Sequence, residues 1–108
     1  MTVAIARITL VLAAAHSLKD KRAVLRRLRD RVRQKFNVSI AEVDAQDVWQ
    51  RAVLGVTLVG PDRRQAEAAI DEVLRFVREQ APVAKDEHEL QSFGGGDLHG
   101  PDFTHWEG

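Results

Sequence analysis

The sequence predicts an α+β sandwich in which two helices cover one face of a four-stranded antiparallel sheet. Its hydrophobic pattern switches between the two-residue period of a strand and the 3.6-residue period of a helix, in the order β-α-β-β-α-β. Two helix N-cap signals, at Ser17 and Asp62, each follow a strand pattern and precede another. This order is that of the ferredoxin-like split βαβ fold, which leaves the second face of the sheet open.

The first helix is expected between two strands. Residues 3–12 alternate an apolar face with a mixed one, which predicts a strand. Ser17 then begins a helix as its N-cap, with Asp20 at the capping-box position three residues later. Apolar residues at helical spacing form the core-facing stripe of this helix: Leu25, Leu28, Val32 and Phe36. Residues 38–44 predict the second strand.

The second helix is expected to repeat this arrangement. Residues 45–51 are polar enough for a hairpin connection, and residues 52–59 are apolar enough for a central strand. Asp62 is the next N-cap, with Gln65 at its capping-box position. The buried stripe of this helix is Ala66, Ile70, Val73 and Val77. Residues 83–93 predict a fourth strand from the weakest pattern, because they are charged and alternate little.

Length and composition indicate one domain. The 108 residues suffice for a single core, which we expect over residues 1–93. The chain has no Cys, which excludes a disulfide or a thiolate metal site. Residues 94–108 have little apolar content and are expected to be a disordered tail. Four donors in the tail match no closed metal site that we know: Asp97, His99, Asp102 and His105.

The chain is expected to be cytoplasmic and to have no membrane segment. No apolar run approaches the ~20 residues of a membrane-spanning helix. The apolar N-terminal stretch is followed by its positive charges, whereas a secretory signal carries them in front. The lack of Cys fits a reducing compartment.

The charges of this chain are segregated along the sequence. Residues 19–35 hold nine of its 16 Lys and Arg residues and only two acidic residues, a net charge of +7. Residues 42–108 hold fourteen acidic and six basic residues, a net charge of −8, so the whole chain is neutral. Such segregation suggests an anionic partner, and RNA or a ribosomal particle is the first candidate.

The basic residues of the first helix form an ordered row. Helical spacing places five of them on one flank of the buried stripe: Lys19, Arg22, Arg26, Arg29 and Arg33. Guanidinium groups at that spacing suit a phosphate backbone. The nearest aromatic residue, Phe36, belongs to the core stripe, so the helix itself favours backbone recognition over base stacking. The alternative is that acidic residues of the second helix neutralise these charges: Asp71, Glu72 and Glu79.

Three segments resemble a known family. They are residues 16–22 (HSLKDKR), 36–44 (FNVSIAEVD) and 46–52 (QDVWQRA), and the resemblance spans residues 3–77. They are similar to the YlxP-like bacterial family of unknown function, which is ferredoxin-like. Genes of that family tend to lie near those for translation initiation and ribosome maturation, so the resemblance implies an RNA- or ribosome-associated role. It implies no catalytic residue.

Three other groups of residues along the chain are candidate sites. His16, Ser17 and Lys21 could contact a phosphate at the start of the first helix, although Ser17 is expected to be occupied as a cap. Trp49 and Arg51 are candidate partner contacts, with packing of Trp49 at the core edge as the alternative. Three acidic residues near the hairpin could hold a cation, but a solvated strand end is expected there: Glu42, Asp44 and Asp47.

Three functions follow as expectations, and none needs a cofactor or a metal. The first is an RNA- or ribosome-associated binding module that uses the basic helix. The second is a homodimeric interaction domain or small-ligand regulatory domain that uses the open sheet face. The third is a small hydrolase of acylphosphatase-like topology, which is disfavoured because Ala13, Ala14 and Ala15 stand where a Gly-rich phosphate loop would be required.

Overall fold

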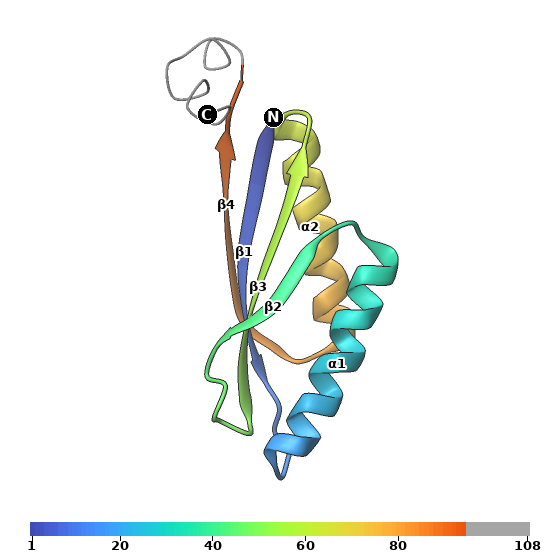
Figure 1. Cartoon of the computed structure of the whole chain (residues 1–108), viewed down its shortest axis with the longest axis vertical. Helices are drawn as coiled ribbons and strands as arrows, with labels where there is room; N and C mark the ends of the chain where they lie inside the picture. Colours follow the sequence, from blue (N-terminus) through green and yellow to red (C-terminus); the bar gives the residue numbers. More distant parts are fainter. Residues whose placement is uncertain (95–108) are drawn as a thin grey trace, which may run out of the picture.

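A computed structural model of the chain describes residues 1–94. Six elements follow one another: β1 (Thr2–Val11), α1 (Leu18–Lys35), β2 (Ser39–Asp44), β3 (Arg51–Gly60), α2 (Arg63–Gln80) and β4 (Val83–Ser92). The strands form one sheet in the order β2-β3-β1-β4, and every neighbouring pair is antiparallel. Both helices lie on the same side of this sheet (Figure 1). The predicted ferredoxin-like α+β sandwich is therefore confirmed.

The two predicted caps begin the two helices. The Ser17 hydroxyl accepts a hydrogen bond from the backbone N–H of Asp20 at 3.1 Å, and the Asp20 carboxylate accepts one from the backbone N–H of His16. The Asp62 carboxylate accepts from the backbone N–H of Gln65 at 2.8 Å. These bonds satisfy N–H groups that have no partner within a helix, which explains why each helix begins where it does.

The core lies between the sheet and the helices. Alternate residues of β1 and β3 point toward the helices and are almost fully buried, with Ile8 and Leu54 among them. The stripes of α1 and α2 cover this layer, as their periodicity predicts. Gly60 ends β3 against the first turn of α2, where a Cβ would lie 3.1 Å from the backbone nitrogen of Ala66.

The helices cover different strands. Helix α2 contacts β1, β3 and β4, whereas α1 contacts β2 and α2. Helix α1 therefore lies over the β2 edge of the sheet, and one of its flanks has no neighbouring helix (Figure 1). Since β2 follows α1 through a short connection, the C-terminal end of β2 lies beside the N-terminal turns of α1.

The second face of the sheet is open. Three apolar residues of this face are exposed, namely Ile5, Val11 and Val59, whereas Val53 of the same face is only 2% exposed. No helix within residues 1–94 is long and apolar enough to cross a membrane. The tail of residues 95–108, with the donors Asp97, His99, Asp102 and His105, lies outside the described residues.

Candidate nucleic-acid interface on helix α1

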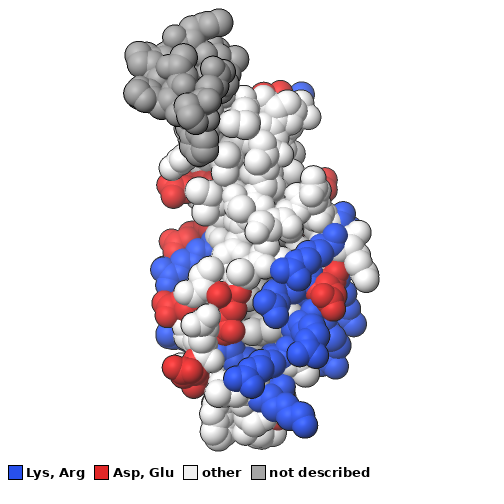
Figure 2. All heavy atoms as spheres, viewed as in Figure 1, with Lys and Arg blue, Asp and Glu red and all other residues white. Residues whose placement is uncertain are grey.

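The basic row lies on the flank of α1 that faces away from α2. Arg33 fixes this orientation, because its guanidinium donates to the backbone oxygen of Ile40 in edge strand β2 at 3.0 Å. Lys19, Arg22 and Arg26 are exposed, and Arg29 is half-buried. Figure 2 shows Lys and Arg side chains gathered over α1, with few acidic side chains among them. The predicted row is thus a continuous basic surface over the β2 edge.

The acidic residues of α2 do not neutralise this surface. Lys21 is the one basic residue of α1 that forms an ion pair with another described residue. Asp71, which could have paired with α1, lies 3.9 Å from His88 of β4 instead. Glu72 and Glu79 form no ion pair within residues 1–94. The charge of the row is therefore free of acidic partners across the described part of the chain.

The other flank of α1 is used to hold the two helices together. Arg31 donates to the side-chain oxygen of Gln80 at 2.9 Å. The Lys35 ammonium lies 4.7 Å from the ring centre of Phe76, which itself packs edge-on against Phe36. Such a cation–π contact holds the aliphatic stem of Lys35 over the aromatic pair. Arg31 and Lys35 thus pack against α2, whereas Lys19, Arg22 and Arg26 of the outer row are exposed.

Lys21 is buried, although the sequence suggested a phosphate contact there. Its side chain is 1% exposed and lies on the core-facing stripe. The ammonium donates to the backbone oxygens of Ala45 at 2.6 Å and Val48 at 2.7 Å. The ammonium also forms an ion pair with Glu42, whose carboxylate Oε2 atom lies 2.7 Å away. This buried oxygen accepts no hydrogen bond within the described residues, so the ion pair is its polar contact. Through these contacts, Lys21 holds the β2–β3 turn against α1.

The β2–β3 turn carries Trp49 beside the start of α1. Its chain passes through the left-handed region at Ala45, with φ of 58°, and β3 begins at Arg51. Trp49 is 51% exposed, so it lies mostly outside the core edge. Arg51 is exposed opposite Val11 of β1. The backbone of this turn lies beside the N-terminal end of α1, because the Lys21 ammonium bonds to the oxygens of Ala45 and Val48.

Two of the three phosphate candidates at the start of α1, Ser17 and Lys21, have other partners, whereas His16 is exposed. Ser17 is the N-cap, and the backbone N–H of His16 is bonded to Asp20. The Asp20 carboxylate also brings a negative charge into the first turn. Among the predicted anion-binding residues, the row of α1 thus remains the available set.

One cluster could hold a metal ion, and the sequence reasoning did not find it. Glu67 and Asp71 lie one helical turn apart on α2, and His88 approaches them from β4. The His88 Nε2 atom lies 3.2 Å from a Glu67 oxygen, and the three donor atoms are within 4.8 Å of one another. All three side chains are partly exposed, so a hydrogen bond between His88 and Glu67, with Asp71 at 3.9 Å from the imidazole, explains the geometry without an ion. Only the i, i+4 spacing of Glu67 and Asp71 was visible in the sequence.

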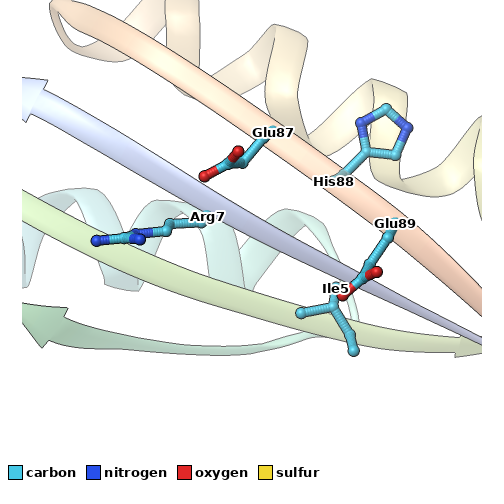
Figure 3. A pocket seen from close by; sticks show the side chains of 5 residues that line it. All are labelled: Ile5, Arg7, Glu87, His88 and Glu89. Carbon is cyan, nitrogen blue, oxygen red and sulfur yellow. The ribbon is translucent and has the colours of Figure 1, made fainter.

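A shallow hollow lies on the other side of β4. Ile5 and Arg7 of β1 line it together with Glu87 and Glu89 of β4, while His88 turns toward α2 (Figure 3). The hollow is open and holds both signs of charge. Its lining side chains include no hydroxyl or thiol nucleophile.

The shifted pKa values of the described residues have structural causes. Two hydrogen bonds from the Arg78 guanidinium, at 2.7 and 2.9 Å, hold the pKa of Asp86 below its ordinary value and join α2 to β4. The backbone N–H of Gln65 lowers the pKa of the Asp62 carboxyl at the N-cap of α2. Both groups stabilise the fold, and neither lies on the basic row.

The fold and the surface together define a ferredoxin-like α+β protein with a basic outer helix and a half-exposed Trp beside it. The chain belongs to the family described as "Protein of unknown function (DUF503)", which matches residues 3–89. It is similar to the uncharacterized protein YlxP of Bacillus subtilis (strain 168), with 51% identity over 63 residues. That match covers 58% of this chain and 68% of the relative. The resemblance to the YlxP-like family is therefore confirmed.

Two designed proteins are similar in structure. A de novo designed protein with ferredoxin fold, LFR1 1, has 15% identity, coverage of 88% of each chain and a TM-score of 0.49. The de novo designed protein Ferredog-Diesel has 15% identity, coverage of 85% of each chain and a TM-score of 0.41. Neither likeness bears on function.

Proposed function

We propose that this protein is an RNA-binding module that holds a phosphate backbone along the basic row of α1, with ribosomal RNA as the first substrate to test. One observation carries the proposal: the row has no acidic partner within residues 1–94, although the whole chain is neutral. A basic surface left unneutralised favours a polyanion as its partner. The row spans fifteen residues from Lys19 to Arg33, about 21 Å of helix, which reaches several successive phosphates.

The proposal is tested by the affinity for a labelled RNA, measured by fluorescence anisotropy between 50 and 200 mM KCl. With four or five phosphate contacts, the affinity of the native protein should fall about 50- to 130-fold over this range, at a slope of about −0.7 per contact. Replacing Lys19, Arg22 and Arg26 by Gln should weaken binding and lower that slope by about 2. These three residues have no side-chain hydrogen bond in the described structure, so their replacement should leave folding intact.

A matched control carries the same change of charge on the other helix. Arg63, Arg64 and Arg75 of α2 are exposed, and the triple Gln variant also removes three positive charges. If this control weakens binding as much as the α1 variant does, general charge rather than the row is responsible. If the native protein binds no RNA at 50 mM KCl, and remains in the free fractions when ribosomes are sedimented, the proposal is refuted.

A second candidate function is a homodimeric interaction through the open sheet face. Val59 is 66% exposed there, with Val11 at 43% and Ile5 at 39%. Exposed apolar residues on one face favour an interface, and the interleaved Arg7 and Glu87 supply opposite charges for a two-fold contact. Sedimentation equilibrium should show a dimer that Val59→Glu converts to a monomer. A monomeric native protein at high concentration would argue against this candidate.

A further inference from the structure

We infer that the RNA bound by this protein is single-stranded and that an unpaired base stacks on the indole of Trp49. This inference rests on the proposed function and adds to it the class of nucleic acid. Single-stranded segments are recognised by aromatic side chains on which bases stack, whereas the bases of a duplex are already stacked on one another. The basic row alone would accept either form.

The Trp49 ring is available to a ligand. It is 51% exposed, which is unusual for the largest apolar side chain. Within residues 1–94, the aromatic pair and the cation–π contacts all involve Phe36, Phe76 and Lys35, and none involves Trp49. An indole with a free face offers a base contact that tolerates any base identity.

The backbone on both sides of Trp49 is held in place. On one side, the Val48 oxygen accepts from the buried Lys21 ammonium at 2.7 Å. On the other, the Gln50 oxygen accepts from the backbone N–H of Leu12 at 2.8 Å, and the Gln50 side chain donates to the Ala13 oxygen. A side chain presented from a fixed backbone loses little conformational entropy when it binds, so this turn is suited to recognition.

The turn and the row form one surface with two kinds of contact. Lys21, which is next to Arg22 in the sequence, bonds to the Val48 oxygen, so the backbone that carries Trp49 is held beside the N-terminal end of α1, where the row begins. Asp47 is exposed on the turn and repels phosphate there. An uncharged base is therefore favoured at Trp49, while the phosphates that flank it lie along the Arg residues of α1.

The test compares two labelled probes, a 12-nucleotide oligoadenylate and a 12-base-pair RNA duplex, at 50 mM KCl. Trp49→Ala should weaken binding of the oligoadenylate about 5- to 150-fold, the contribution of one base–aromatic stack, and change binding of the duplex less than two-fold. Trp49→Phe should retain most of the affinity, because it keeps an aromatic face. Phe93→Ala is the matched control, since Phe93 is a similarly exposed aromatic, 48%, at the end of β4.

A second measurement reports the contact directly. In a Trp106→Phe background, Trp49 is the one remaining Trp, and oligoadenylate should quench its fluorescence while the duplex should not. The inference would be overturned if Trp49→Ala lowered the affinity for both probes equally, or if it changed neither affinity. In the second case, Trp49 would be assigned to a contact with a protein. If the triple Gln variant of α1 no longer binds the oligoadenylate but Trp49→Ala still does, the proposed RNA-binding function is kept and base stacking on Trp49 is rejected. If the native protein binds neither probe, both proposals fall.

Discussion

Replacement of Lys21 by Met should reveal how far the β2–β3 turn depends on one buried ammonium. The substitution keeps the aliphatic stem and removes the charge. It leaves the Glu42 carboxylate, whose side chain is 18% exposed, without its cation. It also leaves the Val48 oxygen without its donor, whereas the Ala45 oxygen keeps the backbone N–H of Val48 at 3.1 Å.

The expected loss follows from these two changes. Breaking a buried ion pair by removing one partner costs about 3–5 kcal/mol, and the partial exposure of Glu42 favours the lower end. An unsatisfied carbonyl adds about 1 kcal/mol. We therefore expect the free energy of unfolding to fall by about 3–4 kcal/mol, which lowers the melting temperature by about 12–30 °C at 4–8 °C per kcal/mol.

Urea denaturation of three variants is the assay. Lys19→Met makes the same substitution on an exposed residue of the same helix and should change stability by less than about 0.5 kcal/mol. The double variant Lys21→Met with Glu42→Leu should be more stable than Lys21→Met alone, because it leaves no buried charge unpaired. The reasoning is refuted if Lys21→Met costs no more than Lys19→Met.

Three further predictions concern the fold. Ala45→Gly should stabilise the protein by about 1 kcal/mol in thermal denaturation, because Ala45 has a φ of 58°, which glycine adopts without a Cβ penalty; destabilisation would contradict this. Gly60→Ala should destabilise by about 1–3 kcal/mol, since the new Cβ would meet the backbone of Ala66 at 3.1–3.2 Å; an unchanged melting temperature would show that α2 shifts freely. Asp86→Asn should cost about 1 kcal/mol at pH 7. Because the folded pKa of Asp86 is depressed, this difference should persist above its ordinary pKa of 3.8 and vanish as the pH falls through the lowered value, which melting curves from pH 7 to pH 2 would check.

The fold was predictable because its signals are local. Ser17 and Asp62 cap the helices through hydrogen bonds to residues only three positions later, so each cap can be identified from a short stretch of sequence. The fourth strand had the weakest pattern for a physical reason. Residues of β4 that face α2 include Asp86 and His88, which bond to polar partners on that helix rather than packing as apolar core.

The candidate site was only partly predictable. The row of α1 follows from helical spacing, but the structural role of Lys21 was missed because a lysine near a helix N-terminus was interpreted as a phosphate contact. Its position four residues before Leu25, on the buried stripe, was the available signal. The placement of Trp49 beside α1 depends on contacts between residues 27 positions apart, such as Lys21 with Val48, which no local pattern contains.

The basic side chains gathered over α1 and the acidic side chains elsewhere on the surface separate charge across the described part of this molecule, which gives it an electric dipole (Figure 2). Because the net charge of the protein is zero, a distant polyanion does not attract it as a whole. The field of the polyanion does rotate the dipole, so that the positive outer flank of α1 faces the polyanion when the two molecules meet. The same dipole lets copies of the protein align head to tail near the isoelectric point of about 6.9, where solubility should be lowest and should rise with added salt. Purification at moderate ionic strength would then keep the protein dispersed, and the choice of salt becomes part of any binding experiment.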